Sequence, residues 1–209
     1  TLMDYIKPYN LLKALPHKLN AFYKKKSSSG LIVKNKSKSI KKFDPVTNFD
    51  KAFEKYIRKI IIKEFPKDSI IGEEFKDKES LNDFKWTIDP IDGTKAFVAG
   101  QPTWSNLVGI AFKEKSMLGL ANFPALKKFY INDKKKSYVY KNGKKSILNS
   151  SNNKNLKSVR VIGSFHGILS TEKQKKIIDK FNWTFNFVSF DALNYCLLAE
   201  GICMIGLRW

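Results

Sequence analysis

The chain has 209 residues, 43% hydrophobic and 13% aromatic, which suffices for a substantial buried core and argues against a disordered chain. Its formal net charge is +20, but only three of its 39 basic residues are arginines, so a specific nucleic-acid partner, which arginine usually recognises, is disfavoured. No apolar run reaches the roughly 18 residues that a membrane-spanning helix needs, and no signal peptide opens the chain, so we expect a cytoplasmic protein with no membrane partner.

The first third of the chain predicts two helices. One covers Tyr9–Lys26 and is interrupted near Pro16, because proline removes a backbone donor. The other covers Lys51–Phe65, where apolar residues recur at helical spacing until Pro66 ends the pattern. Between them, Leu31–Val33 begins a short strand, which a polar, lysine-rich loop follows.

Short apolar segments bounded by Gly, Pro, Asn and Asp predict a run of strands in the middle of the chain. These strands are Ser69–Gly72, Trp86–Ile88, Leu107–Phe112, Leu118–Asn122, Lys128–Asn132 and Ser137–Lys141. We therefore expect a mainly antiparallel sheet in an N-terminal α+β lobe that covers residues 1–150.

The last quarter of the chain returns to alternating strands and helices. Val159–Gly163 and Asn186–Ser189 are predicted to be extended, Thr171–Phe181 is predicted to be a helix capped by Ser170, and Ala192–Glu200 is predicted to be an apolar helix. A polar connection precedes them, so residues 151–209 are interpreted as the start of a C-terminal α/β lobe.

Three pairs of acidic residues stand out between residues 44 and 92: Asp44 with Asp50, Glu73 with Glu74, and Asp89 with Asp92. A single Asp or Glu is more often a surface charge or a helix cap than a functional group. A cap is the favoured interpretation for Asp50, which precedes a predicted helix, and a surface role for Glu74 is as reasonable as a functional one. Neither a surface charge nor a cap explains the pair Asp89 and Asp92, because both flank a rigid proline after an apolar strand that begins at Trp86.

The segment from Asp89 to Thr94 reads Asp-Pro-Ile-Asp-Gly-Thr. Pro90 restricts the backbone, and Gly93 permits a tight turn into a helix start, so the segment directs two carboxylates and the carbonyl of Ile91 to one place. Hard oxygen ligands suit Mg²⁺, and free N–H groups at a helix start suit phosphate. Together they indicate metal-assisted hydrolysis of a phosphate ester.

In order and spacing, FDPVTNFD, IIGEEF and WTIDPIDGTKAFVAGQPTWSNLVGI resemble the consecutive signatures of the inositol monophosphatase superfamily. The resemblance covers about residues 10–209 and is strongest to the histidinol-phosphatase-like branch, although the arginine usual after DGT is Lys95 here. It implies an α/β (α+β) fold: the layered αβαβα sandwich of the inositol monophosphatase and fructose-1,6-bisphosphatase type, incomplete at the C-terminus. It also implies a homodimer.

Placed on matching positions, the resemblance implies that Glu73, Asp89, Asp92 and the carbonyl of Ile91 bind two or three Mg²⁺ ions. These ions would neutralise the phosphoryl oxygens and the leaving alkoxide.

The resemblance also implies catalytic and substrate-binding residues. Thr94, with Asp44 as its partner, would deprotonate the attacking water, and Glu74 would assist. The backbone amides of Gly93 and Thr94 would hold the phosphate. Asp191 would line the substrate pocket, or would instead cap the helix that follows it; both interpretations stay open.

The predicted function is therefore a Mg²⁺-dependent phosphomonoesterase acting on a small phosphorylated alcohol, with L-histidinol phosphate as the first candidate and an inositol monophosphate as the second. One alternative is a 3′(2′),5′-bisphosphate nucleotidase, which shares the DPxDGT core. Another is a catalytically silent, lysine-rich binding protein with the same fold.

The resemblance implies one more metal-binding Asp, a few residues beyond Gly201 and the strand after it. No Asp follows Asp191 in this sequence. We expect that the chain is a fragment of a longer protein, that the additional ligand lies beyond Trp209, and that the fragment alone is weakly active or inactive.

Overall fold

The structure is a computed structural model that describes residues 5–38, 43–152, 160–164, 170–181, 184–187, 191–203 and 205–208. The chain divides into two compact units, an N-terminal unit (Thr1–Ser146) and a C-terminal unit (Ile147–Trp209). The sequence placed the boundary between lobes after residue 150. The two units are described separately below.

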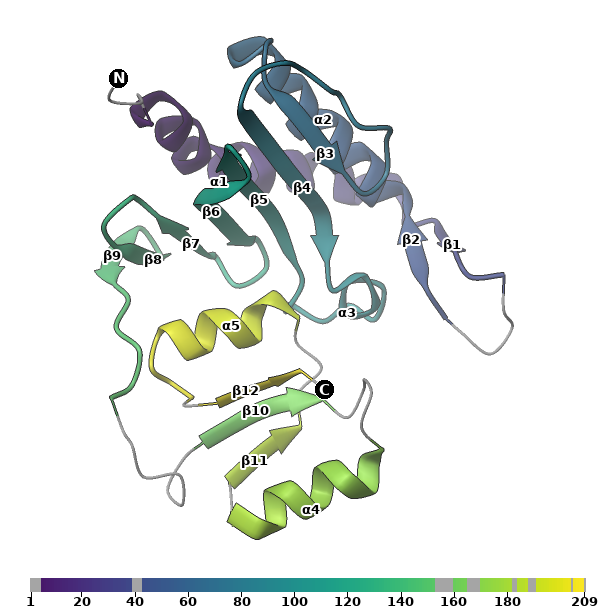
Figure 1. The fold of residues 1–209 in the computed structure, drawn as a ribbon. Coiled ribbons are helices and arrows are strands. Elements are labelled where there is room, and N and C mark those ends of the chain that lie inside the picture. The colour runs from purple at the N-terminus through teal and green to yellow at the C-terminus, as the bar shows by residue number, and fades with distance from the viewer. Residues whose placement is uncertain are drawn as a thin grey trace. The chain divides into compact units, whose positions relative to one another are not determined.

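A seven-stranded sheet forms the centre of the N-terminal unit (Figure 1). In spatial order, which is also chain order, its strands are β3 (Ser69–Gly72), β4 (Phe84–Asp92), β5 (Ser105–Phe112), β6 (Lys115–Phe123), β7 (Lys128–Asn132), β8 (Ser137–Lys141) and β9 (Lys144–Ile147). The β3–β4 pair is parallel, and the pairs from β4 to β8 are antiparallel. The predicted mainly antiparallel sheet is confirmed, and β9 is a strand that the sequence did not indicate.

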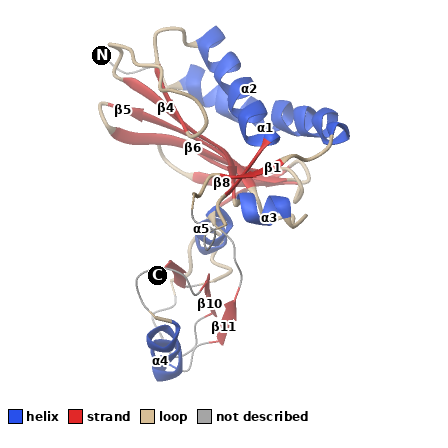
Figure 2. Cartoon of the chain, turned by 90° about the vertical axis from the view of Figure 1, so that its right-hand side faces the viewer, coloured by secondary structure: helices blue, strands red, loops and turns tan. Residues whose placement is uncertain are grey.

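Two helices, α1 (Ile6–Lys26) and α2 (Asn48–Glu64), cover one face of this sheet (Figure 2). Their inward residues and alternate residues of the strands form one buried cluster, which includes Leu15, Phe53 and Trp86. This cluster explains why the predicted interruption of the first helix is wrong. Pro16 lies inside a continuous α1, because the burial of leucines on both sides of it outweighs the roughly 3 kcal/mol that an internal proline costs.

A short antiparallel ladder joins the two helices, after a single 3₁₀ turn at Ser27–Ser29. It pairs β1 (Val33–Asn35) with β2 (Pro45–Thr47). The sequence predicted the first of these strands two residues too early and missed the second, which lies within the FDPVT segment.

The functional motif lies where β4 ends. β4 runs through Asp89 to Asp92, so it is longer than the predicted strand Trp86–Ile88. Gly93 follows with a φ of 79°, in the left-handed region that glycine adopts without strain, and the short helix α3 (Thr94–Val98) begins directly after it.

The C-terminal unit contains a three-stranded parallel sheet in the order β11 (Thr184–Phe187), β10 (Arg160–Ser164) and β12 (Ile205–Arg208). Its helices are α4 (Thr171–Phe181) and α5 (Ala192–Ala199). The hydroxyl of Ser170 accepts a 3.4 Å hydrogen bond from the backbone N–H of Lys173, as expected of the predicted cap. The mixed α/β class is confirmed, and none of the helices in the described residues is long and apolar enough to cross a bilayer.

Candidate active site

The end of β4 departs from regular pairing with β5 between Asp89 and Asp92. Two side chains of β5 hold this irregular segment. The amide of Asn106 donates a 2.7 Å hydrogen bond to the carbonyl of Pro90, and the hydroxyl of Ser105 donates one of 3.3 Å to Oδ2 of Asp92. Asn106 and Ser105 are fully buried, so this support is rigid. The sequence analysis missed both residues.

Asp89 is the most perturbed acid of the site. Its Oδ1 atom is buried and has no hydrogen-bond partner among the residues that the structure describes. Burial, followed by the negative charges of Asp92 and Glu73, raises the pKa of Asp89 to about 7. A cavity of about 240 Å³ lies beside it, lined by Ile71, Thr87, Ile88, Asp89, Leu107 and Gly109. A hydrogen bond from the backbone N–H of Ile91 favours the ionised form of Asp89, but the uncharged residues that line the cavity supply no positive charge to it.

Asp50 connects the start of α2 to the Asp-Gly-Thr turn. Its Oδ2 accepts hydrogen bonds from the backbone N–H and the hydroxyl of Thr47, at 2.7 and 2.5 Å, which completes a capping box. Its Oδ1 accepts a longer 3.5 Å hydrogen bond from the hydroxyl of Thr94. Burial raises the pKa of Asp50, the hydrogen bonds from Thr47 oppose that rise, and the charge of Glu74 adds to it.

This arrangement corrects the predicted pairing of Thr94 with Asp44. Within the described residues, the hydroxyl of Thr94 bonds to Asp50 and, at 3.0 Å, to the carbonyl of Ile91. Asp44 instead lies ahead of β2, where its backbone N–H donates to Asn35 and its carbonyl accepts from Lys36. The physical reason is the cap: it turns the carboxylate of Asp50 back over the first turn of α2. Asp50 does take part in capping α2, but as the N3 residue of a capping box whose N-cap is Thr47, so the helix begins three residues earlier than predicted.

Glu73 and Glu74 share one cation. The ammonium of Lys36 lies 2.9 Å from Glu73 and 2.5 Å from Glu74. Burial by itself lowers the pKa of Lys36, but the hydrogen bonds to Glu74 and Glu73 outweigh it, so the net pKa is raised. In the sequence Lys36 lies in a lysine-rich loop, and nothing there relates it to Glu73 and Glu74, which are 37 and 38 positions away.

A buried ion pair on α2 holds the Glu73–Glu74 segment in position. Glu54 is fully buried on α2 and accepts a 2.8 Å hydrogen bond from Arg58. Its carboxylate also accepts hydrogen bonds from the backbone N–H groups of Glu74 and Phe75, at 2.7 and 3.3 Å. The sequence did contain one indication of this role, because Glu54 is an acidic residue on the inward face of a predicted helix.

The oxygen atoms of these carboxylates are of the kind that binds a hard divalent cation, but they are not arranged as a complete set of metal ligands. In the described part of the chain, no group of three or more His, Cys, Asp or Glu side chains is arranged to hold a metal ion. The buried, unbonded oxygen of Asp89 beside two further carboxylates is nevertheless what a cation would stabilise. The charges of Asp92 and Glu73 act on Asp89, and Glu73, Asp89, Asp92 and the carbonyl of Ile91 remain the predicted ligands.

The predicted substrate residues Gly93 and Asp191 lie in different units. Gly93 forms the turn before α3, and its amide remains a prediction as a phosphate donor. Asp191 occupies the N-cap position of α5, but its side chain makes no capping hydrogen bond; its carbonyl accepts one from Asn194 at 3.2 Å. The cap interpretation is therefore right in position only, and a pocket role for Asp191 remains a prediction.

Known proteins similar to this chain agree with the fold and the motif. A histidinol-phosphatase from Chlorobaculum parvum is 42% identical over 86 residues, which are 41% of this chain and 33% of that protein. A fructose-1,6-bisphosphatase/inositol-1-monophosphatase from Aquifex aeolicus is 30% identical over 169 residues, covering 76% of this chain and 61% of that protein. The solved structure of a Thermotoga maritima IMPase superposes with a TM-score of 0.72 at 25% identity, covering 96% of this chain and 74% of that one.

The chain spans between about a third and three fifths of the length of these two curated relatives. The chain matches the general pattern of the inositol monophosphatase family over residues 11–208. This range extends into both units and contains every candidate residue described above. The chain belongs to the inositol monophosphatase family.

Proposed function

We propose that the protein is a Mg²⁺-dependent phosphatase that hydrolyses a small phosphorylated alcohol. The observation that carries this proposal is the buried, unbonded Oδ1 of Asp89, which lies among carboxylates at the turn into α3. Such a group is unfavourable in a purely structural role and is suited to a cation-binding one.

Glu73, Asp89, Asp92 and the carbonyl of Ile91 are the proposed ligands, and the proposal includes the two or three ions that the family resemblance implies. Bound Mg²⁺ lowers the pKa of water and neutralises phosphoryl charge. The chain itself contributes preorganisation, since Asn106 and Ser105 hold the Asp89–Asp92 segment in place before substrate arrives.

The proposed proton path runs from the attacking water to Thr94 and then to Asp50. The Thr94 hydroxyl directs its hydrogen toward Asp50 or Ile91, so a lone pair remains to accept the proton of a water molecule. The raised pKa of Asp50 makes it a better proton acceptor than a fully solvated carboxylate. The N–H groups of Gly93 and Thr94 are proposed to bind the phosphate.

For the substrate, L-histidinol phosphate is the first proposal and inositol 1-phosphate the second. The names of the relatives support this order: the protein with 42% identity is a histidinol-phosphatase, and the one aligned over 169 residues is a fructose-1,6-bisphosphatase/inositol-1-monophosphatase. These names describe those proteins, of which the aligned segments cover 33% and 61%.

A substrate panel tests the proposal. Phosphate release by the full-length protein is measured with L-histidinol phosphate, inositol 1-phosphate and adenosine 3′,5′-bisphosphate, with Mg²⁺ and with EDTA. We expect Mg²⁺-dependent release that is fastest with histidinol phosphate and lost in Asp89→Asn. The matched control is Asp83→Asn, which removes an exposed carboxylate whose only recorded ion pair within the described chain is a long contact of 3.7 Å to Lys113. Unchanged turnover in Asp89→Asn would contradict the proposal.

A further inference from the structure

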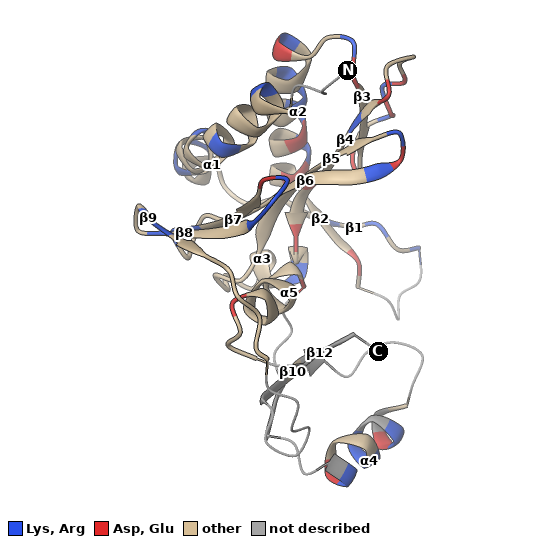
Figure 3. Cartoon of the chain, turned by 60° about the vertical axis from the view of Figure 1, so that its left-hand side comes forward, with Lys and Arg blue, Asp and Glu red and all other residues tan. Residues whose placement is uncertain are grey.

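The two helices that cover the sheet are strongly basic on their outer side (Figure 3). α1 carries no acidic residue. Of the three acids of α2, Asp50 and Glu54 are buried, and only Glu64, its last residue, is exposed. The exposed lysines of the two helices are Lys7, Lys13, Lys18, Lys24, Lys25, Lys51, Lys55, Lys59 and Lys63. So many like charges on one surface repel one another within the screening length of about 10 Å, and a bound polyanion relieves that repulsion.

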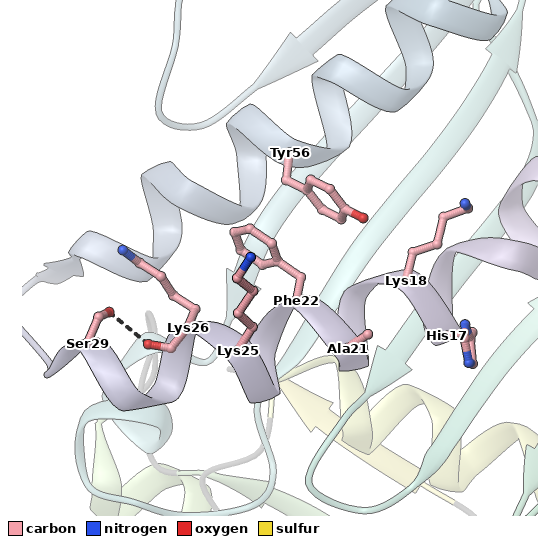
Figure 4. A pocket seen from close by; sticks show the side chains of 8 residues that line it. All are labelled: His17, Lys18, Ala21, Phe22, Lys25, Lys26, Ser29 and Tyr56. Carbon is pink, nitrogen blue, oxygen red and sulfur yellow. Dashed lines mark hydrogen bonds between the residues drawn. The ribbon is translucent and has the colours of Figure 1, made fainter.

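A cavity of about 630 Å³ opens in this basic surface, lined by residues of α1, of the turn after it and of α2 (Figure 4). Phe22 and Tyr56 form its aromatic wall, with ring centroids 4.5 Å apart and ring planes within 9° of parallel. Lys18, Lys25 and Lys26 line it as well, and no acidic residue does. None of these three ammonium groups has an ion-pair partner among the described residues. Because the two rings stack on each other and Phe22 also packs against Phe53, a ligand meets the outer side of this aromatic pair, next to unneutralised positive charge.

We propose that the outer face of α1 and α2 binds single-stranded nucleic acid, with one base stacked at the Phe22–Tyr56 pair and the flanking lysines neutralising the phosphates. An aromatic platform inside a basic groove is the arrangement that holds single strands without regard to sequence. A duplex hides its base faces and is therefore a poorer ligand for the aromatic wall. The basic groups are lysines, which act as point charges, so this binding is tolerant of sequence.

Lys18 and Lys25 provide the electrostatic test. Binding of a fluorescein-labelled decauridylate to the full 209-residue chain is followed by anisotropy between 50 and 200 mM KCl. Over this range the logarithm of the binding constant depends roughly linearly on the logarithm of the salt concentration, so a salt slope can be measured. We expect the double change Lys18→Gln/Lys25→Gln to reduce the salt slope by about 1.4, at about 0.7 for each lost phosphate contact. The matched control Lys135→Gln/Lys136→Gln removes two exposed charges from the β7–β8 turn, and we expect its slope to stay within 0.3 of the parent value, on the order of half of one contact.

Tyr56 provides an independent test of stacking. Tyr56→Leu keeps the apolar contact with α1 and removes the aromatic face, so affinity is expected to fall about fivefold or more with the salt slope unchanged. Circular dichroism and thermal melting of each variant show whether the fold is retained, and Phe22→Leu serves as a second variant of the same wall.

Three results overturn the proposal: an equal loss in the control pair, equal affinity for a duplex of the same length, or binding to phosphatidylserine vesicles without binding to the oligonucleotide. Uridine monophosphate is tested as a competitor. If it competes as strongly per mole as the unlabelled decamer, the proposal is also overturned, because the cavity would then be a site for a free nucleotide.

Discussion

The hydroxyl of Thr94 lies 3.5 Å from Oδ1 of Asp50, although the two residues are 44 positions apart in the chain. One comes from the first turn of α3 and the other from the first turn of α2, so two helix starts meet at the end of β4. The same carboxylate closes the capping box of α2 with its other oxygen. Asp50 therefore joins a structural role to the proposed catalytic one.

Replacing Asp50 by Asn should separate these two roles. Asparagine keeps a side-chain oxygen that accepts the capping-box hydrogen bonds from Thr47, so the melting temperature of Asp50→Asn should change little. It cannot accept a proton, so kcat should fall by about 10²–10⁴. Steady-state phosphate release with L-histidinol phosphate measures the change. Asp44→Asn is the matched control, and an equal or larger loss in that variant would restore Asp44 as the partner of Thr94.

Asp89 should destabilise the metal-free protein at neutral and higher pH. Its pKa is about 7 in the folded chain and 3.8 as a free side chain, so folding favours the protonated form. The associated stability is fully present below about pH 3.8 and is lost as the pH rises through 7. In EDTA at pH 8, Asp89→Asn should therefore be more stable than the parent by on the order of 2 kcal/mol, and at pH 4 the difference should vanish. Urea unfolding at both pH values measures this, and a gain that is independent of pH would refute the electrostatic cause.

Lys36 should compete with a cation for the Glu73–Glu74 pair. Its ammonium lies within 2.9 Å of both carboxylates, so Mg²⁺ binding at Glu73 has to displace it. Lys36→Gln should tighten Mg²⁺ binding by about threefold to tenfold, since removing an interaction of about 1 kcal/mol at a partly exposed pair changes the equilibrium by that order. Isothermal titration calorimetry without substrate measures the affinity, with Lys38→Gln in the same loop as the control. Weaker binding in Lys36→Gln would show that the lysine supports the site instead.

The Glu54–Arg58 pair should be among the most sensitive positions for stability. Both side chains are largely buried, and Glu54 also accepts the two backbone N–H groups after Glu73. Glu54→Ala leaves Arg58 uncompensated and should cost about 3–5 kcal/mol of unfolding free energy. Glu64→Ala, at the exposed end of the same helix, should cost less than about 0.5 kcal/mol. Denaturant titration measures the unfolding free energy of both variants. Similar losses in Glu54→Ala and Glu64→Ala would contradict the prediction.

Gly72 offers an independent probe of the same pair. A Cβ atom at this position would lie 2.0 Å from Oε1 of Glu54, so Gly72→Ala has to displace the carboxylate from the segment that it positions. We expect this single methyl group to reduce stability by about 1–3 kcal/mol, as overpacking does, and to weaken Mg²⁺ binding with it. The matched control is Gly119→Ala in β6, where the backbone is not left-handed and the nearest atom to the added carbon, Oδ1 of Asn132, lies at an ordinary contact distance of 3.6 Å. Calorimetry that found unchanged Mg²⁺ affinity in Gly72→Ala would separate Glu54 from the metal site.

The sequence by itself determined the parts that depend on local patterns. Residues that alternate or recur at helical spacing predicted β3, β7, β8 and α4 at their observed limits. Asp-Pro-Ile-Asp-Gly-Thr predicted a turn into a helix, because the backbone restrictions of proline and glycine act within a few residues. The same motif identified the family, which the match over residues 11–208 shows.

Only the tertiary structure decided which distant groups meet. Asp50 and not Asp44 faces Thr94, Lys36 pairs with both Glu73 and Glu74, and α1 continues through Pro16. Each outcome depends on contacts between residues far apart in the chain, whose energies exceed the local preferences that a sequence pattern reports. Spacing along the chain predicts which side chains share a strand or a turn, but the packing of α2 against the sheet determines which carboxylate reaches the site.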